Sequence, residues 1–265
     1  MAATEPSSEH VVVEFDAGIQ TIRFNRPRKK NALSVAMYAA AAAALNDARK
    51  RGEVRVIVLR GSEGVFTAGN DLADFMKAGG IGGAGTDTPV TQFIDHLVDC
   101  EKPVIAAVEG VAIGIGVTML LHCDLVYAGE KARFHMPFVN LALCPEAGSS
   151  FMLPRIMGHQ RASELILLGE PFSAQTAHEY GIVNQVLADS AVVDRALSSA
   201  AALAAKPPAA LRRSKQLLRA GYRETLRTAI EAEYEGFSKG LASPEAAEAF
   251  AAFFEKRAPD FSRFE

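Results

Sequence analysis

Two glycine-containing segments each follow a predicted strand and precede a predicted helix. They are Phe66–Leu72 (FTAGNDL) and Gly110–Gly116 (GVAIGIG). A junction of this kind exposes backbone N–H groups at the positive end of a helix, where a developing oxyanion can be held. Two such donors from separate loops are what a thioester enolate needs. Ordinary glycine turns into helices have the same spacing, so the residues alone leave both interpretations open.

Other kinds of site find less support in the sequence. His122, Cys123 and Asp124 are adjacent, and adjacent residues of a regular element do not converge on one metal ion. The chain has no HExxH motif and no paired CxxC, so a metal site is not expected. The segment Ala147–Ser150 (AGSS) lacks the GxSxG pattern of a serine nucleophile and suits a helix N-cap better.

The glycines of the second junction also match part of a dinucleotide-binding fingerprint. That fingerprint requires GxGxxG, and Gly114 and Gly116 supply the first two of its glycines. Met119 stands where the third glycine should be, and no acidic residue further on is well placed for a ribose. A nicotinamide or flavin cofactor is therefore not expected.

The pattern of apolar residues predicts the elements that must hold these junctions. Val11–Phe15 and Ile19–Phe24 flank a short turn and predict a β-hairpin, and Ser34 is expected to cap a helix that runs to about Lys50. Further strands are predicted at residues 54–60, 104–108, 124–128 and 183–187. Helices alternate with the first strands, which predicts an α/β fold with crossover connections. Later helices are expected at residues 149–157, 161–168, 173–180, 190–205, 209–220, 224–239 and 244–256.

The helical character of the last part of the chain suggests a division into two regions. We predict a core over residues 1–190 and an appended helical region over residues 191–265, with a break at Pro207-Pro208. The phenylalanines of this region could form a subunit interface or pack within the chain, and the sequence leaves both open. They are Phe250, Phe253, Phe254 and Phe261.

Composition limits the classes of function. The chain has 265 residues, 49% of them hydrophobic, and a formal net charge of −3, which gives no general attraction for nucleic acid or an anionic membrane. Its longest apolar stretch is interrupted by Glu109 and three glycines, so a membrane span is not expected. Three cysteines and a polar N-terminus without signal-peptide character predict a cytoplasmic protein. A glycine-rich segment between Lys77 and Pro89 predicts a mobile surface loop or a lid over a ligand.

Three segments in order carry a family resemblance: FTAGNDLADF, then KPVIAAVEGVAIGIGVTMLLHCDLVYAGEKARFHMPFVNLALCPEAGSS, then GEPFSAQTAHEYGIVNQV. They resemble the enoyl-CoA hydratase/isomerase (crotonase) superfamily, and the match runs from about Val11 to the C-terminal PDFSRF. The resemblance implies a spiral of ββα units to about Leu187, followed by a helical C-terminal region. It also implies an acyl-CoA substrate, no cofactor beyond the CoA of that substrate, and homotrimers or dimers of trimers.

The resemblance implies roles for particular residues. The two enolate donors fall on the backbone N–H of Asn70 and of Ile115. The carbonyl of Ala68 and the neighbouring Leu72 are expected at the adenine of CoA. A basic trio is expected near the CoA phosphates and pantetheine, although such a trio is otherwise an ordinary solvated turn. The trio is Arg28, Lys29 and Lys30, and the remaining residues expected to bind the substrate are Gly69, Asp71, Gly114 and Phe138.

The sequence departs from the hydratases of this superfamily at both of their glutamates. Thr118 stands at the first position and Phe138 at the second, and neither can act as a carboxylate base. Glu146, in CPEAGSS, is instead similar to the single catalytic glutamate of peroxisomal-type Δ3,Δ2-enoyl-CoA isomerases. One carboxylate suffices to move a proton from C2 to C4. Its apolar neighbours predict a raised pKa, whereas the alternative is a carboxylate stabilised by the following helix N-terminus.

The leading hypothesis from the sequence is therefore isomerisation of 3-enoyl-CoA to trans-2-enoyl-CoA, with Glu146 as the single acid and base. An enoyl-CoA hydratase, or another reaction of the superfamily on a different acyl group, is the alternative within the enzyme class. A non-catalytic acyl-CoA-binding protein is the alternative outside it. Glu146 separates the two classes, because a pure binder has no use for a carboxylate at the reacting carbons.

Overall fold

The computed structural model describes residues 9–77 and 87–264, so most of the predicted glycine-rich loop lies outside the described residues. The main sheet has six strands in the order β1-β2-β3-β4-β6-β9. Its first pair is antiparallel, with Val11 opposite Phe24, which confirms the predicted hairpin, and its other pairs are parallel. The strands are β1 (Val11–Asp16), β2 (Ile19–Phe24), β3 (Val56–Arg60), β4 (Val104–Val108), β6 (Leu125–Gly129) and β9 (Gln185–Leu187).

A second sheet of three short strands lies beside the first and has the order β5-β7-β8. It contains β5 (Val111–Ile113), β7 (Arg133–His135) and β8 (Phe172–Ser173). The chain passes from β4 to β5 and then into α4 (Ile115–Thr118), and from β6 to β7 and then towards α5 (Ser149–Met157). This repeated strand–strand–helix path confirms the predicted spiral of ββα units.

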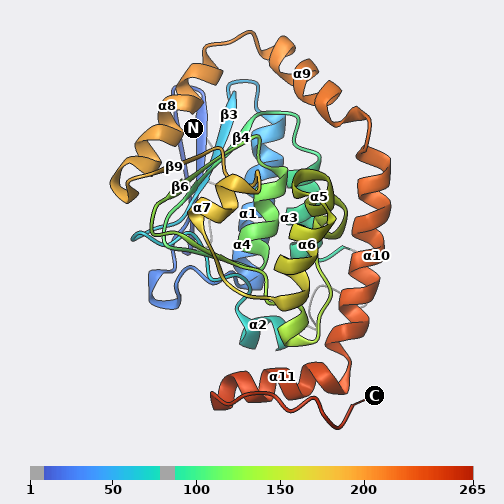
Figure 1. Cartoon of the computed structure of the whole chain (residues 1–265). Helices are drawn as coiled ribbons and strands as arrows, with labels where there is room; N and C mark the ends of the chain where they lie inside the picture. Colours follow the sequence, from blue (N-terminus) through green and yellow to red (C-terminus); the bar gives the residue numbers. More distant parts are fainter. Residues whose placement is uncertain (1–8, 78–86, 265) are drawn as a thin grey trace.

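Helices close both faces of this framework (Figure 1). Ser34 caps α1 (Val35–Lys50) through its side chain, as predicted, by accepting a hydrogen bond from the Met37 N–H. The helix predicted at 161–168 is in fact α6 (His159–Ser163) followed by a π-helical turn at Glu164–Leu168. The other helices are α2 (Leu72–Lys77), α3 (Pro89–Val98), α7 (Ala174–Glu179), α8 (Val192–Ala204), α9 (Pro208–Ala220), α10 (Arg223–Leu241) and α11 (Pro244–Glu255). Turns of 3-10 helix lie at Pro27–Lys29, Met119–His122, Val139–Leu141 and Asp189–Ala191.

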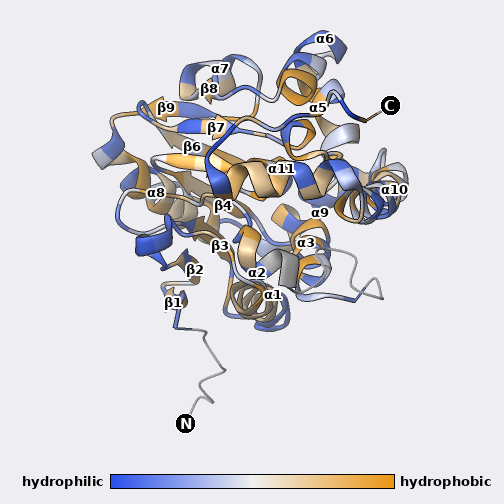
Figure 2. Ribbon diagram, turned by 90° about the horizontal axis from the view of Figure 1, so that it is seen from below, coloured by the Kyte–Doolittle hydropathy of each residue, from blue (hydrophilic) through white to orange (hydrophobic). Residues whose placement is uncertain are grey.

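Alternate residues of the central strands face two separate cores. On β3, Ile57 and Leu59 belong to the large core, whereas Val56 and Val58 pack with the buried face of α8. Both faces of the strand are therefore buried, which explains its continuous apolar sequence. In Figure 2 the central strands are largely orange, whereas polar blue residues are frequent on α9 and α10.

The C-terminal helices α9, α10 and α11 form an arc around the edge of the core (Figure 1). The predicted boundary at residues 190 and 191 falls in the 3-10 turn before α8 and stays a prediction. Phe250 is buried within the chain, whereas Phe253, Phe254 and Phe261 are exposed. None of the helices in the described ranges combines the length and the apolar character that a transmembrane span requires.

Candidate active site

A cavity of about 690 Å³ brings together most of the residues that the sequence singled out. It opens between the loop after β3, the β5–α4 junction, the segment before α5 and the C-terminal helix α11, near the lower end of the molecule in Figure 1. Ten of the predicted site residues line it: Lys29, Lys30, Ala68, Gly69, Asn70, Asp71, Leu72, Gly114, Phe138 and Glu146. Arg28 is exposed on the 3-10 turn beside this lining, and the Ile115 side chain points into the core.

Backbone pairing holds the two glycine junctions side by side. The Thr67 N–H donates to the Val111 carbonyl at 3.0 Å, and the Ile113 N–H donates to the Thr67 carbonyl at 3.1 Å. Gly69 lies directly against this strand, because a Cβ there would sit 2.6 Å from the Ile113 carbonyl oxygen, and its φ is +83°. Only glycine satisfies both the close approach and the left-handed conformation.

The backbone amides predicted to stabilise the enolate are those of Asn70 and Ile115. Leu33 bonds to the residues on either side of Asn70, which leaves the Asn70 N–H on the opposite edge. Ile115 is the first residue of α4, where helical N–H groups have no partner within the helix. Within the described residues, neither N–H has a protein acceptor. The Asn70 side chain is itself anchored by a hydrogen bond from the Tyr38 hydroxyl.

Glu146 is buried on the turn that precedes α5, with 1% of its surface exposed. Neither of its carboxylate oxygens has a hydrogen-bond partner among the described residues. Its backbone carbonyl accepts bonds from the Ser149 N–H at 3.1 Å and from the Ser149 hydroxyl at 2.6 Å, which fixes the turn. Burial, reinforced by the negative charge of Glu233, raises the pKa of Glu146 to about 8. The carboxyl group is therefore a much stronger base than an exposed glutamate, as its apolar flanks predicted.

The N-terminus of α5 is occupied by Glu233 of α10, which sequence analysis did not identify. Its Oε2 accepts from the Gly148 N–H at 2.5 Å, and its Oε1 accepts from the Ser150 N–H at 2.9 Å and from the Ser150 hydroxyl. The N-cap of α5 is Gly148, which confirms that the segment Ala147–Ser150 forms a helix N-cap, although Gly148 has no side chain to cap the helix. The Glu146 carboxylate makes no hydrogen bond to this helix end, because Glu233 takes those donors.

The sequence does contain a signal for Glu233. The buried positions of α10 are Leu226, Ile230, Glu233 and Phe237, a spacing of four, three and four residues. This spacing defines one face of a helix, so Glu233 is a glutamate in an otherwise apolar stripe. A charged residue at such a position needs a partner when it is buried, and here the partner is the start of α5.

The two positions at which the resemblance to hydratases would place glutamates hold no carboxylate. Phe138 is buried against the cavity. Thr118 is buried in α4, and its hydroxyl has no hydrogen-bond partner among the residues that the structure describes. The other carboxylate in the cavity lining, Asp71, forms an ion pair with Arg26 at 2.7 Å. Burial alone would raise the pKa of Asp71, but the Arg26 bond and charge lower it. Glu146 is therefore the one unpaired carboxylate in the described lining.

Lys29 and Lys30 make one wall of the cavity basic, and the C-terminal segment adds a further cation. Arg257 lines the cavity beside Phe253 and Phe254 and is held by Glu248 at 2.5 Å. The lining thus combines basic groups with an apolar interior, which suits a ligand with an anionic head and an apolar chain. Among the described residues, no group of three or more His, Cys, Asp or Glu side chains could hold a metal ion.

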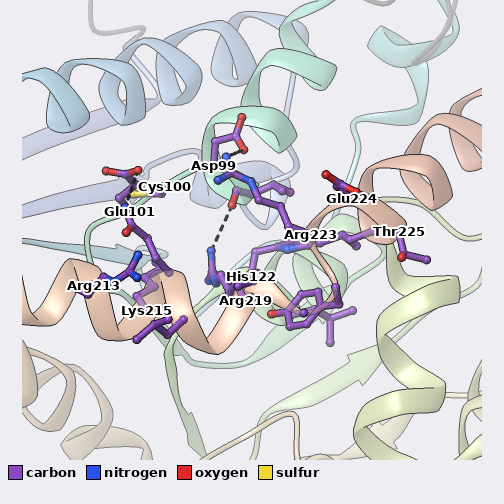
Figure 3. A pocket seen from close by; sticks show the side chains of 18 residues that line it. Asp99, Cys100, Glu101, His122, Arg213, Lys215, Arg219, Arg223, Glu224 and Thr225 are labelled. Atoms are coloured by element: carbon purple, nitrogen blue, oxygen red, sulfur yellow. Dashed lines mark hydrogen bonds and ion pairs between the residues drawn. The ribbon is translucent and has the colours of Figure 1, made fainter.

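A second cavity, of about 510 Å³, lies between α9, α10 and the segment before β4 (Figure 3). Its side chains are strongly charged but largely paired within the chain: Arg223 bonds to Asp99 at 2.9 Å, and Arg219 donates to the His122 carbonyl at 2.7 Å. Lys215 donates to Asp124 at 2.6 Å. None of the predicted site residues lies in this cavity.

Comparison with known proteins agrees with this geometry. A family profile described as enoyl-CoA hydratase/isomerase matches residues 14–263. The chain belongs to the enoyl-CoA hydratase/isomerase family. Its spiral fold matches a solved enoyl-CoA hydratase/isomerase from Pseudoalteromonas atlantica, with a TM-score of 0.90 and 39% identity over 96% of this chain and 100% of that one.

Relatives within the enoyl-CoA hydratase/isomerase family are named for different reactions. Enoyl-CoA delta isomerase 2 of Rattus norvegicus is 36% identical over 85% of this chain. This chain spans 58% of that relative's length. The 2,3-dehydroadipyl-CoA hydratase of Escherichia coli is 34% identical over 95% of this chain and 98% of its own length. The family is thus an enzyme family of acyl-CoA chemistry, and the reaction of this member has to be argued from its site.

Proposed function

We propose that this enzyme isomerises 3-enoyl-CoA thioesters to trans-2-enoyl-CoA thioesters, with Glu146 as the single acid and base. The observation that carries the proposal is the isolation of one buried carboxylate, without hydrogen-bond partners, in a cavity that also contains the Asn70 and Gly114 backbone. A base that takes a proton from carbon needs a raised pKa, and burial provides it.

The reaction runs in two proton transfers. The ionised Glu146 removes a proton from C2, and the electron pair of that C–H bond moves into the thioester to give a dienolate. The N–H groups of Asn70 and Ile115 donate to the enolate oxygen as its negative charge develops. The protonated Glu146 then returns the proton to C4, which leaves the double bond between C2 and C3 and restores the carboxylate.

Hydration is the second candidate, and the site gives it less support. The two-glutamate mechanism needs two carboxylates to position and activate a water, and this site offers Thr118 and Phe138 in their places. A hydrophobic ring at the second position removes both a proton carrier and a water ligand. Another reaction of the family on a different acyl group would use the same enolate donors and differ in its use of Glu146.

We extend the proposal to ligand binding and assembly. The basic trio Arg28, Lys29 and Lys30 is proposed to face the CoA phosphates, and the Ala68 carbonyl with Leu72 and Asp71 is proposed to face the adenine end. Phe138 contributes to the apolar wall beside the reacting chain. The reaction as written needs no cofactor beyond the CoA of the substrate. We further propose that the enzyme acts in the cytoplasm as a homotrimer or a dimer of trimers.

The direct test compares native enzyme with Glu146→Gln on trans-3-hexenoyl-CoA, following formation of the conjugated thioester. We expect the isomerisation rate of the variant to be roughly a hundredfold to ten-thousandfold lower. The reason is that, among the described residues that line the cavity, Glu146 is the one carboxylate without a partner. Hydration of 2-hexenoyl-CoA, measured in parallel, should be weak in both proteins. The exposed Glu130→Gln serves as the matched control and should retain native rates.

Other outcomes would point to the alternatives. Dominant hydration that survives Glu146→Gln would show that another group activates water and that the isomerase proposal is wrong. Binding of CoA thioesters without turnover of either substrate would point to a different acyl group or to a non-catalytic binder.

A further inference from the structure

The position of Glu146 next to a helix N-terminus poses a chemical problem. Glu146 lies two residues before Gly148, the N-cap of α5, and α5 runs for nine residues. The N–H groups and the dipole of such a helix end stabilise a nearby carboxylate and lower its pKa. A Glu146 that bonded to these donors would be a weak base, so the neighbouring helix end has to be occupied by another group.

Glu233 is that group. It reaches the start of α5 from α10 and accepts from the N–H groups of Gly148 and Ser150 and from the Ser150 hydroxyl. Gly148 has a φ of +73°, and a Cβ there would lie 2.3 Å from Leu226 of the same helix α10, so α10 packs closely against this turn. His122 also holds this turn through a 2.6 Å hydrogen bond from its Nε2 to the Ala147 carbonyl.

We propose that Glu233 is a positioning residue for the isomerisation: its carboxylate occupies the N-terminal donors of α5 and so leaves the Glu146 carboxylate without hydrogen bonds inside the cavity. This inference rests on the proposed function, in which Glu146 is the base. Glu233 acts twice, because it removes the donors that would stabilise ionised Glu146 and also places a second negative charge near it.

The titratable groups that interact electrostatically with Glu146 come from three elements. Tyr38 of α1 donates to Asn70, and Cys144 of the preceding segment donates to the Glu233 carbonyl at 3.5 Å. The hydroxyl of Tyr234 on α10 is buried and has no hydrogen-bond partner in the part of the chain that the structure describes. Glu233 is the one of these groups whose charge raises the pKa of Glu146. Burial raises the pKa of Glu233 itself, but its three donors favour the ionised form.

The experiment titrates Glu146 directly in the protein without substrate. Infrared difference spectra over pH, with the Glu146→Gln protein as reference, isolate the carboxyl band of Glu146. In Glu233→Gln we expect its midpoint to fall by about one pH unit, as removal of a nearby like charge predicts. Glu231→Gln, the same substitution at an exposed site of α10, should leave the midpoint in place. Equal midpoints in native and Glu233→Gln proteins would overturn the inference.

A milder variant keeps the test usable if Glu233→Gln does not fold. Ser150→Ala removes one donor to Glu233 from an exposed serine, so Glu233 ionises less readily and Glu146 should titrate at a lower pH, with a smaller shift. Glu233→Asp keeps the charge and should restore most of the native midpoint. An unchanged Glu146 midpoint in Ser150→Ala, or a Glu233→Asp midpoint as low as that of Glu233→Gln, counts against the inference.

Kinetics then separate this inference from the proposed function. In Glu233→Gln with 3-hexenoyl-CoA as substrate, the rising limb of kcat/KM against pH should shift to lower pH together with the infrared midpoint. The maximal rate should fall several-fold because Glu146 is then a weaker base. A shifted infrared midpoint in an enzyme that shows no isomerase activity would support the role of Glu233 and refute the proposed reaction. If the enzyme isomerises the substrate but Glu233→Gln changes neither the rising limb of kcat/KM nor the infrared midpoint of Glu146, the positioning role alone is refuted.

Discussion

At the residue scale, the isolation of Glu146 links catalysis to stability. Burial raises its pKa from the ordinary 4.5 to about 8, so the folded protein binds this proton more tightly than the unfolded chain does. The stability that this proton contributes is fully present below pH 4.5 and is lost as the pH rises through about 8. The same burial that makes Glu146 a strong base therefore destabilises the ionised form of the folded enzyme.

Substitution of Glu146 by glutamine should reverse this penalty. Glutamine does not titrate, so its stability does not fall in this way. The free energy of unfolding of the variant, relative to that of native enzyme, should therefore rise by roughly 3–4 kcal/mol as the pH is raised from about 5 to about 8. Urea unfolding of both proteins at the two pH values measures the difference. A constant difference across this range would mean that Glu146 ionises normally, and it would remove the electrostatic support for a single strong base.

The functional residues differ in how far the sequence could reveal them. Glu146 stands in a recognisable segment with apolar neighbours, and those neighbours predicted its raised pKa. Glu233 is distant in the sequence, and its partner is a set of backbone amides that carry no sequence signature. Its place in the apolar stripe of α10 indicates burial, but only the packing of α10 on α5 shows what it binds.

At the element scale, Glu248 of α11 organises the C-terminal segment next to the cavity. Its carboxylate accepts from Arg257, from Arg263 and from the Asp260 N–H, and it is covered on most of its surface. These bonds fold the segment back over α11, where Arg257 and Pro259 line the cavity. A single carboxylate thus fixes one wall of the proposed CoA site.

Glu248→Gln should therefore weaken substrate binding more than it slows the chemistry. We expect the KM for a 3-enoyl-CoA to rise several-fold and kcat to change little, because the variant loosens the wall without touching Glu146 or the enolate donors. Steady-state kinetics beside Glu245→Gln on the same helix provide the comparison. A fall in kcat at unchanged KM would place the effect of Glu248 on the reacting atoms instead.

The sequence predicted the longer elements better than the short ones. The hairpin, α1, α5 and the C-terminal helices have clear apolar patterns and capping or breaking residues. The strands β5, β7 and β8 are only three, three and two residues long, and strands of that length form because the neighbouring chain is already in place to pair with them. The second sheet, which holds one of the two glycine junctions, was therefore not predicted from the local pattern, and the family resemblance implied only repeated ββα units.

At the scale of the whole molecule, α9 has little to pack against within its own chain. Lys215 is the one buried residue of this fully described helix, and it is held by the Lys102 carbonyl and Asp124. Leu217 and Leu218 are 59% and 80% exposed. An amphipathic helix with large apolar side chains on its outer surface is typical of a surface that another subunit covers.

The proposed assembly can be tested on these two leucines. Sedimentation of native enzyme should give three or six times the mass of one chain, and the double variant Leu217→Ser, Leu218→Ser should dissociate at protein concentrations where the native assembly persists. The loss of two large apolar contacts from each subunit is sufficient to weaken such an interface by several kcal/mol. Val13→Ser, at a partly exposed position on β1, is the control for loss of an exposed apolar residue. A native protein that sediments as one chain would contradict the trimer, and a double variant that remains assembled would place the interface away from α9.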